Sequence, residues 1–355
     1  MKSPANTILS HTPENICLLR LSAVGDICHT LPIVRTLQAH FPAAHITWII
    51  GKTEYGLVYD IPGIEFVVFD KSKGLHAYRD VRQHIRGRRF DILLHMQMSL
   101  RASALSLLVT APIKLGFDKQ RAKDMQWLFT NQKIAYQAEQ HVIDSLFGFT
   151  EALGINAHLY QWDIPIPDDD RAFAQQVTAN NTPVLVISPC SSMAYRNWSV
   201  AGYAAVADYA IEKYQMQVIL TGGPSEIEQR YGQAISQLAK QSVTNLVGKT
   251  SLKQLLAILE RANVVVAPDA GPAHMATTVK TPVIGLYATT NPDRARPYLS
   301  ADYTVNHYPE AVQDKYGKSV AEMPWGTRVR DEGTMDRITV NDVTTMLDKI
   351  MQPAG

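Results

Sequence analysis

The sequence is poor in cysteine: its 355 residues include only Cys17, Cys28 and Cys190. These three form no Cys-x-x-Cys pair of the kind that binds a metal, and their odd number gives no complete disulfide framework. Their neighbours are apolar, which is typical of reduced thiols in a core or at the edge of a site. We therefore expect a reducing, cytoplasmic compartment.

Long apolar runs are also missing. No run approaches the ~20 residues that span a bilayer. The stretch from Met1 to Glu14 is polar and contains one lysine, so we expect no secretory signal.

Neither sign of charge is in excess over the whole chain. Lys and Arg number 34 and Asp and Glu number 33, which leaves +1 and excludes a polycation built for nucleic acid. The P-loop motif Gly-x-x-x-x-Gly-Lys-Ser/Thr and the hydrolase motif Gly-x-Ser-x-Gly are both absent. Their absence removes support for P-loop phosphoryl transfer and for a hydrolase nucleophile.

What the chain does have is length and a repeating pattern of apolar runs, glycine or polar turns, and amphipathic stretches. Its 355 residues exceed one ordinary core, so we expect two domains. Strands that alternate with helices predict α/β domains with doubly wound parallel sheets. The expected boundaries are a first domain at 1–160, a linker at 161–182, a second domain at 183–335, and a C-terminal helix and tail at 336–355.

The pattern locates strands in two series. The expected strands lie at 16–21, 46–50, 65–69 and 91–96, and then at 184–188, 217–221, 243–246, 263–267 and 283–287. Two such domains facing each other would place the carboxyl ends of both sheets around a central cleft, where doubly wound folds bind ligands.

Charge divides the two halves. Residues 1–150 contain 17 basic and 12 acidic residues, or +5, so the remainder has 34 − 17 = 17 against 33 − 12 = 21, or −4. The segment 71–123 contains 12 basic and 3 acidic residues, or +9. This segment is either a solvated helical face or a surface for a polyanion such as a phosphorylated sugar, a lipid head group or a membrane.

Five turns after expected strands could carry chemistry. Asp26 follows Gly25 at a helix start, where it could cap the helix or accept a proton from a sugar hydroxyl. In the turn 189–198, hydroxyls precede a cation and a tryptophan, an order that suits phosphate oxygens. The turn 222–226 ends in an acid that could accept from ribose hydroxyls or cap a helix. The turns 268–274 and 287–292 complete the set, and the first of these exposes N–H groups to an anion.

An Asp-x-Asp string at 168–170 could suggest a metal-bound nucleotide sugar. It stands in the proline-containing linker ahead of apolar residues with helical spacing. We interpret it as the acidic first turn of a helix.

Taken together, the turns resemble glycosyltransferase family 9, the lipopolysaccharide heptosyltransferases, over nearly the whole chain. The likeness is carried by Leu19–Asp26 with His29–Pro32, by Arg196–Trp198 and by Asp269–His274. Within the family the chain is most similar to the heptosyltransferase I branch with the OpsX-type enzymes. That finer likeness is carried by Cys28–His29, Trp127–Asn131 and Met335–Ile338.

The resemblance implies a GT-B fold of two Rossmann-like domains and an inverting transfer that needs no metal or other cofactor. ADP-L-glycero-D-manno-heptose would be the donor substrate and an anionic Kdo-lipid A precursor the acceptor. The acceptor would place the enzyme in the cytoplasm, peripheral to the inner membrane, with no nucleic-acid partner and no transmembrane segment.

The same resemblance implies roles for individual residues. Asp26 matches the general base, and Arg196 stands where relatives often have lysine, as a fixed cation for the diphosphate. The donor-binding positions are Ser191, Ser192, Glu226, Asp269, Ala270, Gly271 and His274, with Ala270 in place of the usual Ser or Thr. For the acceptor, we predict contacts from the basic segment: Arg101, Lys119, Arg121 and Lys123.

Two other functions fit the same fold. A nucleotide-sugar epimerase would use two Rossmann-like domains without a lipid acceptor, and a degenerate binding protein would keep the fold without catalysis. The acceptor also stays open between Kdo, phosphorylated Kdo and an existing heptose.

Overall fold

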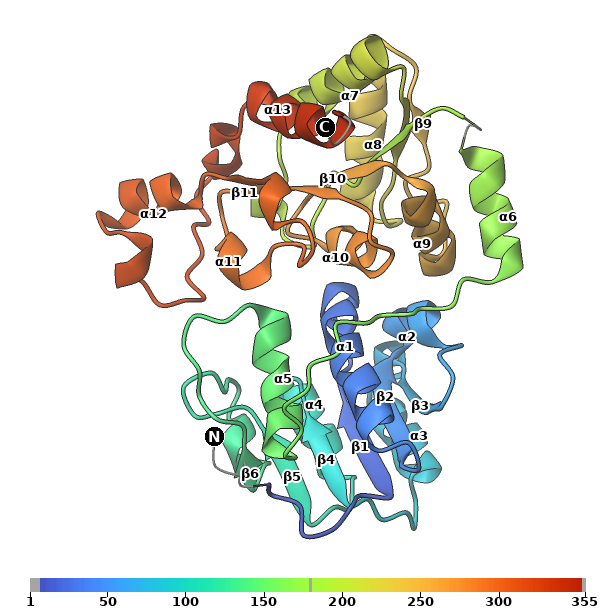
Figure 1. The fold of residues 1–355 in the computed structure, drawn as a ribbon, viewed down its shortest axis with the longest axis vertical. Coiled ribbons are helices and arrows are strands. Elements are labelled where there is room, and N and C mark those ends of the chain that lie inside the picture. The colour runs from blue at the N-terminus through green and yellow to red at the C-terminus, as the bar shows by residue number, and fades with distance from the viewer. Residues whose placement is uncertain (1–6, 179–180, 353–355) are drawn as a thin grey trace. The chain divides into compact units, whose positions relative to one another are not determined.

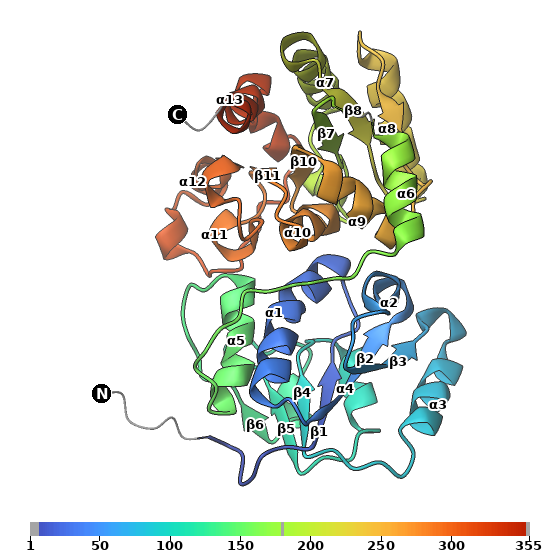
Figure 2. The same cartoon turned by 45° about the vertical axis from the view of Figure 1, so that its right-hand side comes forward.

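The computed structural model describes residues 7–178 and 181–352. The chain divides into two compact units, 1–165 and 166–355 (Figures 1 and 2). The stretch 161–165 therefore belongs to the first unit. Helix α6 (Asp168–Val177) belongs to the second unit, where it packs on helix α9 (Leu252–Arg261).

The first unit alternates strands and helices from its first strand onward. Its strands are β1 (Asn15–Leu19), β2 (His45–Gly51), β3 (Ile64–Phe69), β4 (Ile92–His95), β5 (Ile113–Gly116) and β6 (Gln132–Lys133). Its α-helices are α1 (Val24–His40), α2 (Lys52–Val58), α3 (Leu75–His84), α4 (Leu100–Ser106) and α5 (Val142–Ala152), and 3-10 turns lie at η1 (Lys71–Lys73) and η2 (Gln126–Leu128).

In the described part of this unit the strands form one six-stranded sheet in the order β3-β2-β1-β4-β5-β6, and every pair is parallel. This is the Rossmann order, in which the chain moves outward from the centre twice, once in each direction. The reversal lies between β1 and β4. Ligands of such sheets bind outside the carboxyl ends of the strands at that reversal.

Both faces of the first sheet are covered. Cys17 and Leu19 of β1 are fully buried in one cluster with Val81 of α3 and Leu105 of α4. Successive strand residues point to opposite faces, so Leu18 points to the other one. Helices α1 and α5 pack side by side over the sheet (Figures 1 and 2). This burial explains why the strands read as continuous apolar runs.

The second unit repeats the plan. Its strands are β7 (Val184–Ile187), β8 (Gln217–Leu220), β9 (Thr244–Asn245), β10 (Val264–Pro268), β11 (Val283–Tyr287) and β12 (Thr304–Asn306). Besides α6 and α9, its α-helices are α7 (Val200–Tyr214), α8 (Glu226–Leu238), α10 (Gly271–Thr278), α11 (Pro292–Ala295), α12 (Tyr308–Tyr316) and α13 (Val340–Met351). Its 3-10 turns are η3 (Ala194–Arg196), η4 (Ala301–Tyr303), η5 (Val320–Glu322) and η6 (Thr334–Arg337).

Over the described residues this second sheet is also six-stranded and parallel, in the order β12-β11-β10-β7-β8-β9. Read from the other end, it has the same Rossmann order as the first sheet, with its reversal between β7 and β10. The C-terminal helix α13 packs on α7 and so is part of this unit (Figure 2).

Trp198 fixes the loop after β7 to the core. Its ring is buried beside Gly202 of α7, where an added Cβ would lie 2.4 Å from the ring. The indole N–H donates to the Ile338 carbonyl at 2.9 Å. The preceding residues of the loop are therefore held at the carboxyl edge of the sheet.

Among residues 7–178 and 181–352, no helix combines the length and the apolar character that a bilayer crossing needs.

Candidate functional site

In the first unit, the loops after β1 and β4 flank the reversal of the sheet. The loop after β1 leads into α1 and carries Asp26 in the first turn of that helix. Asp26 accepts a hydrogen bond from the Ala23 N–H at 3.0 Å, which is the capping role that the sequence allowed. Its side chain is nevertheless 37% exposed, so it also meets solvent at the carboxyl edge.

The two carboxylate oxygens of Asp26 have different surroundings. Oδ2 accepts the capping bond and also lies 2.6 Å from a guanidinium nitrogen of Arg20. Oδ1 lies 4.0 Å from His29 Nδ1, which is beyond hydrogen-bond distance. Oδ2 is thus engaged within the protein, and Oδ1 is the better placed oxygen for an incoming hydroxyl.

Arg20 lies within the segment 19–26 that carries the family likeness, but no role was predicted for it. It follows β1, is buried, and donates through another nitrogen to the Met96 carbonyl that follows β4. A buried guanidinium requires compensation by acceptors and anions, which these two partners provide. Arg20 therefore connects Asp26, which follows β1, with the loop after β4.

Two glutamines extend this framework and were also missed. Gln97 Oε1 accepts from the Leu21 N–H at 2.6 Å and from the Ser22 N–H at 3.2 Å. Gln126 is fully buried and donates to the His95 carbonyl at 2.8 Å and to the Gln97 carbonyl at 3.3 Å. The loops after β1, β4 and β5 are therefore bonded to one another.

The four predicted acceptor residues divide into two kinds. Arg101, Lys119 and Lys123 are exposed at the surface. Arg121 is half-buried and bonded within the protein: it pairs with Asp118 and donates to the Ser145 hydroxyl at 2.5 Å. It also donates to the Ala135 carbonyl at 2.8 Å and to the Gln140 amide oxygen at 3.5 Å. Its guanidinium holds the loop together, whereas the other three cations face outward.

In the second unit, the loops after β7 and β10 meet through Arg196 and Asp269. A guanidinium nitrogen of Arg196 lies 3.1 Å from Asp269 Oδ2 and donates to the Asp269 carbonyl at 3.2 Å. Both side chains are largely buried. The structure thus brings together two predicted site residues that stand 73 positions apart.

Asp269 stays ionised in this setting. Burial alone raises the pKa of its carboxyl, but the neighbouring His274 ring and the charge of Arg196 outweigh burial, so the net pKa is lowered. His274 Nε2 lies 3.7 Å from Asp269 Oδ1, and its ring is buried on α10. Asp269 and His274 therefore form one group with Arg196.

Several buried polar atoms around this reversal have no hydrogen-bond partner within the described residues. They are the Nε of Arg196, the amide nitrogens of Asn197 and Asn291, and the hydroxyl of Tyr195. Buried polar groups in proteins are normally paired, so a cluster of unpaired ones indicates a place that a polar ligand completes. They come from the predicted turns 189–198 and 287–292.

The predicted phosphate residues of the turn after β7 differ in exposure. Ser191 is buried: its N–H donates to the Asn197 amide oxygen at 2.7 Å, and its hydroxyl accepts weakly from the Met193 N–H at 3.4 Å. Ser192 is exposed. Of the two hydroxyls, that of Ser192 is the one presented to solvent.

Helix α10 begins without a side-chain cap. Its N-cap is Ala270, which has an extended backbone and no hydroxyl or carboxylate to accept the first N–H groups. Gly271 and Pro272 follow at the start of the helix. An uncapped helix start with adjacent buried, unpaired donors is suited to an anion.

Glu226 begins α8 and its side chain is exposed, paired on the surface with Arg230. The neighbouring acid Glu228 instead caps the loop, since it accepts from the Gly223 N–H at 2.7 Å and from the Ser225 hydroxyl. The structure therefore assigns the capping role at this turn to Glu228. The side chain of Glu226 faces solvent.

Nothing in the described ranges forms a group of three or more His, Cys, Asp or Glu side chains arranged to hold a metal. The Asp-x-Asp string occupies the first turn of α6, which confirms the interpretation of residues 168–170 as a helix start.

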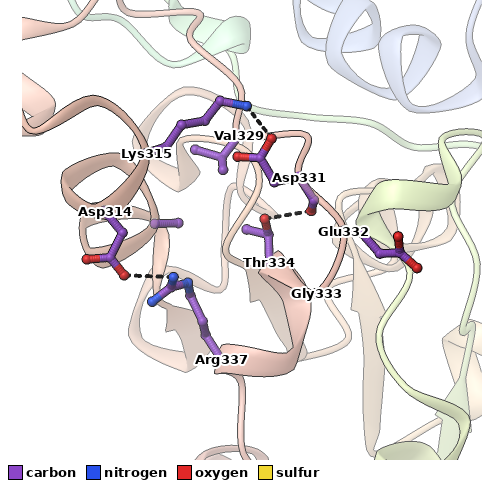
Figure 3. Close-up of a pocket in the computed structure, with 9 residues that line it drawn as sticks. Asp314, Lys315, Val329, Asp331, Glu332, Gly333, Thr334 and Arg337 are labelled. Carbon is purple, nitrogen blue, oxygen red and sulfur yellow. Dashed lines mark hydrogen bonds and ion pairs between the residues drawn. The ribbon is translucent and has the colours of Figure 1, made fainter.

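A pocket of about 190 Å³ lies in the second unit beside α12 (Figure 3). Its two cations are neutralised in place: Lys315 pairs with Asp331 at 2.6 Å and Arg337 with Asp314 at 2.7 Å. We assign it no ligand, because both of its cations are already paired with carboxylates.

Known proteins of one family resemble the chain. A sequence model of glycosyltransferase family 9 (heptosyltransferase) matches residues 78–323. The chain is 40% identical to the lipopolysaccharide core heptosyltransferase OpsX of Haemophilus influenzae, over 97% of this chain and 99% of that protein. It is 22% identical to lipopolysaccharide heptosyltransferase 1 of Pseudomonas aeruginosa, over 81% and 84% of the two chains.

Solved structures share the fold. A family 9 glycosyl transferase from Veillonella parvula is 21% identical with a TM-score of 0.77, covering 95% of this chain and 97% of that one. The Escherichia coli heptosyltransferase WaaC with ADP is 18% identical with a TM-score of 0.70, covering 95% and 99%. The predicted fold class, a GT-B protein with two doubly wound parallel sheets, is confirmed.

Proposed function

Because the chain belongs to glycosyltransferase family 9, the heptosyltransferases, we propose that it transfers L-glycero-D-manno-heptose from ADP-heptose to a Kdo-lipid A acceptor. The proposal rests on the groups that lie where the strand order of each sheet reverses. The first holds an accessible carboxylate, and the second holds a buried cation, an uncapped helix start and unpaired polar atoms. Sugar transfer from a nucleoside diphosphate needs these two kinds of group.

Asp26 is the general base of the proposed reaction. Its Oδ1 takes the proton as the acceptor hydroxyl oxygen bonds to C1 of the heptose, while the bond between C1 and the phosphate oxygen breaks. Attack from the face opposite the leaving ADP inverts the configuration at C1. Arg20 and the Ala23 N–H hold Oδ2, which keeps the carboxylate oriented throughout.

Arg196 stabilises the negative charge that develops on the departing ADP. Its Nε has no partner in the described residues, so it can donate to a phosphate oxygen while its pairing with Asp269 is kept. The start of α10, at Ala270 and Gly271, adds N–H groups to the same diphosphate, and Ser191 and Ser192 line the turn after β7. Fixed protein charge thus takes the role that a metal has in other nucleotide-sugar enzymes.

The remaining donor contacts keep their proposed roles. Glu226 accepts from the ribose hydroxyls, for which its exposed carboxylate would exchange its surface partner Arg230. His274 acts with Asp269 at the diphosphate turn, because the two side chains face each other.

The acceptor is anionic and lipid-linked, so we infer that exposed cations of the first unit contact it. The exposure of Arg101, Lys119 and Lys123 supports this proposal, whereas Arg121 supports the loop of the two lysines from within. An acceptor of this kind places the reaction at the cytoplasmic surface of the inner membrane.

Mass spectrometry of the purified protein with ADP-heptose and a panel of truncated lipid A acceptors tests the proposal. We expect addition of one heptose to the Kdo-bearing acceptor and none without acceptor. Addition only to an acceptor that already bears heptose would assign the enzyme to a later step. Consumption of the donor without any acceptor would favour the epimerase, and no turnover at all would favour the binding protein.

A further inference from the structure

The first unit exposes three large apolar side chains within four consecutive residues. Met125 is 53% exposed, Trp127 is 50% exposed and Leu128 is 58% exposed, all on the turn that contains η2. Scattered apolar residues are normal on a surface, but a contiguous group of this size marks an interaction site.

This turn is held rigidly in place by the residue in its middle. Gln126 is fully buried, and its amide bonds to the His95 carbonyl at 2.8 Å and the Phe117 N–H at 3.1 Å. With Gln126 anchored inward, its apolar neighbours remain outside. Their exposure is therefore a property of the folded loop.

Exposed cations surround the turn. Lys119 and Lys123 lie in the same loop, and the nearby anion Asp118 is already paired with Arg121. Within 119–128 the one acidic residue is Asp124, which is exposed. The loop thus joins a lysine pair to the apolar group.

A second exposed apolar residue and cation stand close by. The Gln126 amide donates to the Gln97 carbonyl at 3.3 Å, which places the turn against the start of α4. There Leu100 and Arg101 are both exposed. The residues of this surface, termed the apolar–basic patch, are Leu100, Arg101, Lys119, Lys123, Met125, Trp127 and Leu128.

We propose that the apolar–basic patch docks on a bilayer that contains anionic phospholipid. Trp127, Leu128 and Met125 would enter the interfacial layer, while the lysines meet the lipid phosphates. The combination favours a lipid surface because a tryptophan with aliphatic neighbours suits the interface and the cations supply long-range attraction. The inference rests on the proposed function for its purpose, since docking would bring the enzyme to a lipid-linked acceptor.

Vesicle co-sedimentation tests this docking. The full-length protein is mixed with vesicles of phosphatidylcholine containing about one third phosphatidylglycerol. The test variant is Met125→Ser/Trp127→Ser/Leu128→Ser, and the matched control is Leu107→Ser, at a side chain 66% exposed at the end of α4. We expect the triple variant to lose vesicle affinity at least about tenfold, and the control to bind like the wild type.

A second measurement tests the proposal even if the triple variant misfolds. Quenching of tryptophan fluorescence by brominated lipid should occur in the wild type and disappear in Trp127→Phe, which keeps the patch apolar and should still sediment with vesicles. Quenching that persists in Trp127→Phe would overturn the proposed insertion.

Other outcomes also decide the question. Equal sedimentation of the triple variant and the wild type would overturn the proposal. So would a triple variant that changes only the oligomeric state, because the patch would then bind a second copy of the chain. If vesicle binding follows the prediction but no heptose is transferred to any acceptor, the proposed function fails and the docking surface stands. If a lipid-free acceptor is glycosylated and no vesicle binding is found, the proposed function stands and the docking surface is refuted.

Discussion

Replacing Arg196 with methionine separates its role in the fold from its role toward the donor. In the structure a guanidinium nitrogen of Arg196 lies 3.1 Å from Asp269 Oδ2, and both side chains are largely buried. Removing the cation leaves the Asp269 carboxylate buried with less compensation. Breaking one side of a buried pair costs about 3–5 kcal/mol of unfolding free energy. We expect Arg196→Met to lose stability in this range.

Affinity for ADP should fall as well. A charge-assisted hydrogen bond contributes about 1.5–3 kcal/mol, which corresponds to roughly a tenfold to 150-fold increase in Kd. Asp269→Asn removes the uncompensated charge, so the double variant Arg196→Met/Asp269→Asn should recover stability. The double variant should still bind ADP more weakly than Asp269→Asn alone.

The assay is a double-mutant cycle with denaturant unfolding for stability and isothermal titration of ADP for affinity. If the double variant binds ADP as tightly as Asp269→Asn alone, Arg196 acts only by holding Asp269 in place. In that case the reasoning about the leaving group is refuted.

Trp198→Ala should lower the unfolding free energy by about 3–5 kcal/mol in denaturant melts, because it empties the space beside Gly202, and a loss below about 1 kcal/mol would contradict the packing described. Burial lowers the pKa of His95 to about 4. The unfolded chain therefore takes up a proton on this ring before the folded protein does, and the free energy of unfolding falls as pH drops from about 6.5 toward 4. His95→Gln should flatten that part of the stability profile by up to about 3 kcal/mol in denaturant melts at a series of pH values. Transfer should continue in excess EDTA, and full loss with rescue by magnesium would restore the metal hypothesis for the acidic string of α6.

The elements that the sequence predicted best are those with strong apolar periodicity. Strand β11 begins and ends at the expected residues, 283 and 287. Strand β6 consists of two exposed residues, Gln132 and Lys133, so no apolar pattern announces it. It exists because β5 offers a free edge for pairing, and pairing partners are a property of the whole fold.

The site shows the same division. Turn chemistry after strands pointed to Arg196 and Asp269, which the structure brings together. Arg20 was missed because its importance comes from the adjacency of β1 and β4, which no local motif encodes. Charge counting grouped Arg121 with the outward cations, since a sequence does not reveal that Asp118 and Ser145 enclose it.

The central claim is that Asp26 removes the proton from the acceptor hydroxyl. The substitution Asp26→Asn keeps an oxygen for the Ala23 N–H but removes the base. Asp342→Asn is the matched control, because Asp342 occupies the same helix position in α13 and accepts from the Thr339 N–H at 2.8 Å.

The deciding measurement is the single-turnover rate of heptose transfer by these variants alongside their ADP affinity. We expect a loss of about 10²–10⁴-fold in rate for Asp26→Asn with ADP affinity unchanged, and a wild-type rate for Asp342→Asn. A rate for Asp26→Asn close to that of the wild type would show that Asp26 is not the base.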